Sequence, residues 1–198
     1  MTAHTFTRRT CLALGGAAMV SALPLPALAL TPAQAEGLVN AAVADINGVI
    51  QSGAPVASMV RSFKNIFDDY ADTSYLAAYA LGNDGRSATN AQKSAFSDAF
   101  GVYLANKYGR RFNEFAGGQI QVQDARAVNS YIEVRTLAVL QGQTPFQVDF
   151  HVSDRPGRPV FFNLIIEGIN MLLSERAEIG AMLDARGGDI DALIRDLV

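Results

Sequence analysis

The segment FQVDFHVS, residues 146–153, decides the fold of this chain. Apolar and polar side chains alternate along it without a break, and its apolar positions are Phe146, Val148, Phe150 and Val152. Because successive side chains of a β-strand point to opposite faces of the sheet, this alternation produces one apolar and one polar face. The segment is therefore predicted to be a strand of an antiparallel sheet that has one face covered by the rest of the protein.

Three neighbouring segments show the same period of two residues, which predicts a four-stranded antiparallel sheet. The turn-forming segments 141–143 and 154–158 separate the last three strands, so these strands are expected to form a meander. The apolar positions are Ile120 and Val122 in the first strand, Ile132, Val134 and Ala138 in the second, and Phe162, Leu164 and Ile166 in the fourth.

Helices are predicted before and after the sheet. The capping-box sequence Thr31–Gln34 starts the first helix, Pro55 starts the second, a short third covers residues 75–81, and a fourth follows Thr89. The fourth has an apolar stripe formed by Phe96, Phe100, Leu104 and Tyr108. Apolar spacing predicts two more helices after the sheet. Helices packed on a curved four-stranded antiparallel sheet form an α+β roll, which often encloses a cavity between its layers.

Residues 1–29 have the three parts of a secretory signal peptide. The pair Arg8–Arg9 is followed by an apolar stretch over residues 11–23 and by Ala27–Ala29, an A-x-A cleavage pattern. The arginine pair and its neighbours resemble a twin-arginine signal. We therefore expect cleavage after Ala29, one mature domain over residues 30–198, and a location in the bacterial periplasm.

Composition and charge exclude several classes of function. The 198 residues include 16 Lys+Arg and 19 Asp+Glu, and the formal net charge of -3 lacks the basic field that nucleic-acid binding requires. No run of about 18 apolar residues is present to span a membrane. One Cys and two His supply neither a disulfide framework nor a metal cluster. We therefore expect no nucleic-acid partner, no metal and no cofactor.

The polar positions of the second and third strands are the strongest hint of catalysis. Glu133, Arg135, Asp149 and His151 are expected on one face of the sheet, where a dry pocket would let them act as acids and bases. The same alternation is more typical of solvent-exposed cross-strand charges. The chain has no nucleophile elbow, phosphate loop or dinucleotide fingerprint.

The C-terminal third of the chain resembles a known family. The segments FFNLIIEGINMLLSER, residues 161–176, and GGDIDALI, residues 187–194, are similar to the end of the MlaC family of toluene-tolerance auxiliary proteins. The stripe of the fourth predicted helix, over residues 96–108, is similar to the middle of that family. The turn at Glu167–Gly168 and the position of Arg176 are the more specific features.

The resemblance implies both a fold and a function. Members of the family are periplasmic carriers that bind a phospholipid by its acyl chains, in a nuclear-transport-factor-like or cystatin-like roll with a deep apolar cavity. They move the lipid between an outer-membrane lipoprotein–porin complex and an inner-membrane ABC transporter with an MCE-domain ring. This activity maintains outer-membrane lipid asymmetry and needs no catalytic residue.

The inward strand faces and the helix stripes are the expected walls of such a cavity. Burial of a CH₂ group is worth about 0.8 kcal/mol, so apolar walls alone can supply the affinity for acyl chains. The expected lipid contacts are Val60, Phe63, Phe67, Phe100, Tyr103, Leu104, Phe112, Ile132, Val134, Phe146, Val148, Phe150, Val152, Phe162 and Leu164.

Two alternatives to a lipid carrier remain open at this point. A pocketed roll of this kind can also contain an isomerase or hydrolase that uses Asp149, Glu133 or His151. A structural adaptor with a filled core would instead have no cavity and no bound lipid.

Overall fold

The computed structural model describes residues 30–110 and 117–198. The expected signal peptide, residues 1–29, and the expected lipid contact Phe112 lie outside the described residues. The elements in chain order are α1 (Pro32–Gln51), α2 (Val56–Tyr70), α3 (Thr73–Leu81), the short 3₁₀-helix η1 (Asp84–Arg86), α4 (Asn90–Gly109), β1 (Gln119–Val128), β2 (Tyr131–Val139), β3 (Phe146–Ser153), β4 (Val160–Ile166), β5 (Ile169–Asn170), α5 (Met171–Asp184) and α6 (Ile190–Asp196).

The strands form one antiparallel sheet in the order β1-β2-β3-β4-β5, which confirms the predicted meander. The prediction of four strands is wrong by one, because β5 pairs with β4. β5 has only two residues, too few for a period-two pattern. It forms because Glu167 and Gly168 both have positive φ, 51° and 80°, which lets the chain reverse in a tight hairpin.

A β-bulge changes which side chains of β4 face the core. The pairing of β3 with β4 shifts between His151 and Val152, so that Val152 lies opposite Phe161 and the next residue, Phe162, is extra. The ring of Phe162 lies 5.7 Å from that of Tyr131 and 5.9 Å from that of His151, on the face opposite Val152. Phe161 takes the core position instead, with 3% of its surface exposed.

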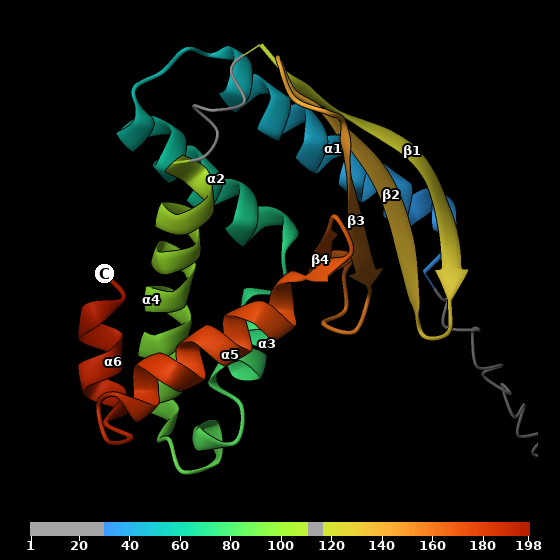
Figure 1. The fold of residues 1–198 in the computed structure, drawn as a ribbon. Coiled ribbons are helices and arrows are strands. Elements are labelled where there is room, and N and C mark those ends of the chain that lie inside the picture. Colours follow the sequence, from blue (N-terminus) through green and yellow to red (C-terminus); the bar gives the residue numbers. More distant parts are fainter. Residues whose placement is uncertain (1–29, 111–116) are drawn as a thin grey trace, which may run out of the picture.

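The helices are layered on one face of this curved sheet and beyond it (Figure 1). α1 packs on β1 and β2, α2 runs beside α4, α5 contacts α3 and β4, and α6 packs on α4. Both predicted capping boxes are present, at Thr31 and Thr89. Among the described residues, no helix combines the length and the apolar character needed to cross a membrane.

The contact between α2 and α4 leaves little room for a side chain at Gly109. A Cβ atom built on Gly109 would lie 3.1 Å from the Cα atom of Val60 and 3.2 Å from the Cβ atom of Phe63. We expect Gly109→Ala to reduce the free energy of unfolding by about 1–3 kcal/mol, because overpacking forces the two helices apart. Gly180→Ala is the control, since a Cβ atom on this glycine of α5 meets nothing within 4 Å. Urea unfolding that gives both variants the same stability would contradict this account of the contact.

Candidate functional site

A cleft with a volume of about 300 Å³ lies between the sheet and the helices. Its exposed lining residues are Gln143, Thr144 and Glu167, so the polar side chains gather where the cleft meets solvent. Aliphatic and aromatic side chains dominate the rest of the lining. These residues are Ile46, Phe63, Phe67, Tyr108, Ile120, Ala138, Leu140, Phe146, Val148, Phe150, Leu164, Ile166 and Met171.

The register of the strands explains the sheet side of the cleft. Phe150 pairs with Leu164, and Val148 pairs with Ile166, so their inward side chains lie next to one another on β3 and β4. Phe146 lies opposite the small side chain of Ala138 on β2, which leaves space above the sheet. The alternation in residues 146–153 thus becomes one wall of the cleft.

Two phenylalanines of α2 form much of the facing wall. Phe63 and Phe67 are one helical turn apart and therefore lie on the same face of α2, with ring centroids 5.3 Å apart. The ring of Phe67 also meets that of Phe161 edge to face at 5.3 Å. Phe161 in turn contacts Phe150 edge to face at 5.5 Å, so Phe161, which does not itself line the cleft, joins the two walls.

The structure places part of the expected lipid contacts in this cleft. Phe63, Phe67, Phe146, Val148, Phe150 and Leu164 line it. The expected contacts that do not line it, within the described residues, are Val60, Phe100, Tyr103, Leu104, Ile132, Val134, Val152 and Phe162.

The expected contacts outside the lining have different surroundings. Phe100 and Leu104 of α4 are buried, and the Phe100 ring stacks on that of Phe96 at 5.6 Å. Val134 and Val152 have no exposed surface. They belong to the packed core.

Several lining residues were absent from the expected set although the sequence carried a signal for some of them. Ile120, Ala138 and Ile166 belong to the predicted inward strand faces, and Tyr108 ends the predicted stripe of α4. Met171 had no comparable signal, because it becomes a lining residue only through the position of α5 against β4.

A group of polar side chains connects α4 to α5 next to the cleft. We call this group the Glu175 cluster, and it consists of Tyr103, Lys107, Tyr108, Glu175 and Glu178. The hydroxyl of Tyr108 donates to Glu175 Oε1 at 2.5 Å, and Lys107 Nζ donates to the same oxygen at 2.9 Å. Lys107 Nζ also donates to Glu178 Oε2 at 2.5 Å, and the hydroxyl of Tyr103 donates to Glu178 Oε1 at 2.6 Å.

The protonation equilibria of the cluster follow from burial and from these bonds. Burial, together with the bond to Glu175, raises the pKa of Tyr108 above its ordinary value of 10.0. Burial alone would lower the pKa of Lys107, but its hydrogen bonds to Glu178 and Glu175 raise it overall. Hydrogen bonds from Lys107 and Tyr103 lower the pKa of Glu178. The cluster therefore holds a charged lysine, ionised Glu178 and neutral phenols at neutral pH.

The residues considered for catalysis lie on the other face of the sheet. Glu133 pairs with His151 in the strand register, and Arg135 pairs with Asp149, so the predicted grouping on one face is present. None of the four lines the cleft. Glu133 forms an ion pair with Arg126 at 2.6 Å and lies 3.8 Å from His151 Nε2. The Arg126–Glu133 ion pair is a cross-strand charge pair, as the alternation predicted, but Glu133 is buried, with 9% of its surface exposed, and is therefore not the solvent-exposed charge that was expected.

His151 makes stability dependent on pH. Burial lowers its pKa below the ordinary value of 6.5, although Glu133 and Asp149 oppose the shift, and the Tyr131 ring covers it at 4.4 Å. Below pH 6.5 the unfolded chain therefore binds more protons than the folded one. The free energy of unfolding consequently decreases as the pH is lowered in that range. We expect His151→Phe, which keeps an aromatic ring beside Tyr131, to weaken this fall. Thermal unfolding about one pH unit above and below 6.5 tests this, and identical falls in both proteins would contradict it.

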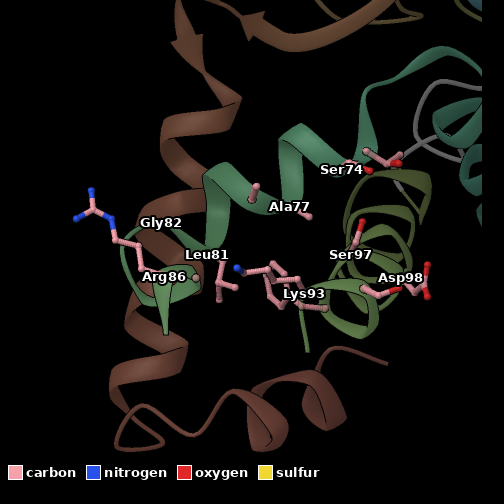
Figure 2. Close-up of a pocket in the computed structure, with 13 residues that line it drawn as sticks. Ser74, Ala77, Leu81, Gly82, Arg86, Lys93, Ser97 and Asp98 are labelled. Atoms are coloured by element: carbon pink, nitrogen blue, oxygen red, sulfur yellow. The ribbon is translucent and has the colours of Figure 1, made fainter. Parts of the chain in front are cut away.

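A second hollow, of about 750 Å³, lies between α3, η1 and α4 (Figure 2). Its lining includes the apolar residues Leu81 and Phe96 and polar side chains such as Ser97 and Asp98 of α4. It is larger than the apolar cleft, and a greater share of its lining side chains is polar or charged, among them Arg86, Lys93 and Asp98. Within residues 30–110 and 117–198, no group of three or more His, Cys, Asp or Glu side chains is arranged to hold a metal ion.

An apolar cleft that lies apart from the acid–base residues is the type of site that binds an apolar ligand. The sequence profile of the MlaC protein family matches residues 38–198, so the chain belongs to the MlaC family. As a member of this family the protein is a non-catalytic lipid carrier, which confirms the resemblance and disfavours the isomerase or hydrolase hypothesis.

The fold is also similar to that of a phospholipid-binding protein from Ralstonia solanacearum, solved in complex with a phospholipid. The TM-score is 0.71 at 20% sequence identity, and the similarity covers 83% of this chain and 94% of that chain. The two proteins therefore share an α+β fold with N-terminal helices, an antiparallel sheet and C-terminal helices.

Proposed function

We propose that this protein is a periplasmic carrier that binds a phospholipid by its acyl chains in the apolar cleft. The observation that carries the proposal is the lining itself, in which aromatic and aliphatic side chains from α2 and the inward strand faces surround one space. The phospholipid bound by the Ralstonia solanacearum protein of similar fold supports this choice of ligand. The roll is then a nuclear-transport-factor-like or cystatin-like one, with the cleft as its cavity.

The size of the cleft bears on how the lipid is held. Its volume of about 300 Å³ is at the lower end of the roughly 300–1,000 Å³ typical of pockets for drug-sized ligands. A diacyl phospholipid is larger than such ligands. Binding therefore requires the cleft to widen or leaves the headgroup outside, near the polar residues Gln143, Thr144 and Glu167.

The route of the lipid follows from family membership. The carrier is proposed to exchange its lipid with an outer-membrane lipoprotein–porin complex and with an inner-membrane ABC transporter that has an MCE-domain ring. This exchange would maintain outer-membrane lipid asymmetry. Export by the signal peptide of residues 1–29 would place the mature domain between the two membranes.

Native mass spectrometry tests the proposal directly. The full-length chain is expressed for export, purified from the periplasm without detergent, and measured before and after organic extraction. We expect a stoichiometric excess of mass that extracts as phospholipid. A bare protein mass, with no lipid acquired from phospholipid vesicles afterwards, would overturn the carrier function.

A further inference from the structure

Tyr108 belongs to both the cleft and the Glu175 cluster. It lines the cleft, and its hydroxyl donates to Glu175 Oε1. A phenol hydroxyl without a partner would be unfavourable against acyl chains, because a buried donor that loses its hydrogen bond costs about 1–3 kcal/mol. The bond to Glu175 satisfies this group away from the lipid and leaves the ring as the part of Tyr108 available to the cleft.

Glu175 is an unusual residue to find at this position. Its side chain is 1% exposed, and its second oxygen, Oε2, is buried without a hydrogen-bond partner among the described residues. Burying a carboxylate with an unused acceptor oxygen lowers the free energy of unfolding. A protein with an apolar side chain of similar volume at such a position is often equally stable or more stable. Stability alone therefore does not explain why a glutamate lies behind Tyr108.

The surroundings of Tyr108 fix it from two sides. The next residue, Gly109, lies so close to Val60 and Phe63 that the end of α4 is held against α2. Glu175 holds the other end of the tyrosine from α5. Met171, which also lines the cleft, lies one helical turn before Glu175 and therefore on the same face of α5. Tyr108 is thus fixed to α2 through the backbone of the next residue and to α5 through its hydroxyl.

We propose that Glu175 is a positioning residue for lipid binding, which holds the Tyr108 ring as a fixed wall of the cleft and so limits the length of acyl chain that the cleft accepts. This role rests on the proposed carrier function. A ring held at its hydroxyl cannot turn aside for a longer chain, whereas an unanchored ring can rotate and admit further methylene groups. Each admitted CH₂ group raises affinity about fourfold, since its burial is worth about 0.8 kcal/mol.

Three variants separate this role from a purely structural one. Glu175→Leu replaces the hydrogen-bond acceptor of Tyr108 by an apolar side chain, while Lys107 keeps its ion pair with Glu178. Tyr108→Phe keeps the ring but removes the anchored hydroxyl. Glu175→Gln keeps an acceptor for that hydroxyl and is the conservative rescue. Glu178→Gln is the matched control, because this half-exposed residue of the same cluster makes no bond to Tyr108.

The experiment measures chain-length discrimination. Each delipidated protein is incubated with vesicles of mixed phosphatidylglycerols that differ only in acyl-chain length, and the bound lipids are counted by mass spectrometry. We expect Glu175→Leu and Tyr108→Phe to shift the ratio of long to short chains at least about fourfold towards long chains. Glu175→Gln should stay close to the wild-type ratio, and Glu178→Gln should equal it.

The outcomes distinguish the two proposals. Wild-type protein that takes up lipid, together with an unchanged ratio in both Glu175→Leu and Tyr108→Phe, would overturn the role of Glu175 and leave the carrier function intact. Wild-type protein that takes up no lipid would overturn both. Thermal unfolding identifies any variant that does not fold, and if Glu175→Leu is such a variant, Tyr108→Phe alone decides.

Discussion

Val148→Asp is expected to reduce phospholipid retention at least about thirtyfold. Val148 lies near the middle of β3, lines the cleft and has 9% of its surface exposed. An aspartate there can be hydrated while the cleft is empty, but acyl chains would strip that water away. Removing a polar group from water without a new hydrogen bond costs about 2 kcal/mol or more, and this corresponds to a factor of about thirty in affinity.

The neighbouring residue supplies the control for this prediction. Gln147 is exposed on the opposite face of β3, so Gln147→Glu adds the same charge one residue away without touching the cleft. Val148→Thr is a milder companion, because it keeps the shape of valine and adds only a hydroxyl. We expect the bound lipid, measured by extraction of the purified proteins, to decrease in the order Gln147→Glu, Val148→Thr, Val148→Asp. Folded Val148→Asp that retains lipid like wild type would show that the acyl chains bind elsewhere.

The same measurement separates the cleft from the other face of the sheet. His151 lies on that face against Tyr131, Phe162 and Glu133 and lines no part of the cleft. Its replacement by phenylalanine should therefore leave lipid retention unchanged.

The sheet could be predicted well because its information is local. Alternation along residues 146–153 depends only on the period of a strand, and the structure has the predicted meander with the predicted inward positions on β2 and β3. The exception on β4 has a geometric cause. The bulge beside His151 exchanges the faces of Phe161 and Phe162, and a run of adjacent aromatic and aliphatic residues gives no sign of where an extra residue falls.

The helical side of the cleft was harder to predict because its information is not local. The stripe of α4 is apolar from Phe96 to Tyr108, yet only its last member lines the cleft, while Phe96, Phe100 and Leu104 are buried in the core. An apolar stripe specifies which face of a helix is covered but not by what. Tyr103 was likewise predicted to line the cavity from its place on α4. Its hydroxyl instead donates to Glu178 of α5, a residue distant in the sequence.

Lys107→Met is expected to reduce the free energy of unfolding by about 3 kcal/mol, the second large effect. Lys107 is the cation that faces Glu175, at 2.9 Å, and Glu175 is almost completely buried. Breaking a buried pair by removing one partner typically costs about 3–5 kcal/mol, because the other charge stays buried without compensation. The hydrogen bond from Tyr108 remains in the variant, which places the expected loss at the lower end of that range.

A surface pair of the same type provides the comparison. Lys64 pairs with Asp68 one turn along α2 at 2.5 Å, but the Asp68 side chain is 46% exposed. Lys64→Met should therefore change stability by only about 0.5 kcal/mol or less. Both variants remove one lysine charge, so a difference between them in urea unfolding reports burial of the partner and not net charge.

The double variant Lys107→Met/Glu175→Leu then tests whether the buried charge is the cause. Replacement of both partners by apolar side chains leaves no uncompensated carboxylate, and such replacements are often neutral or stabilising. We therefore expect the double variant to recover most of the stability that Lys107→Met loses. Lys107 Nζ lies 5.3 Å from the centre of the Tyr103 ring and 5.7 Å from that of the Tyr108 ring. A double variant as unstable as Lys107→Met would therefore mean that Lys107 stabilises the protein through the packing of its aliphatic stem between these two tyrosines, and not through its charge pair with Glu175.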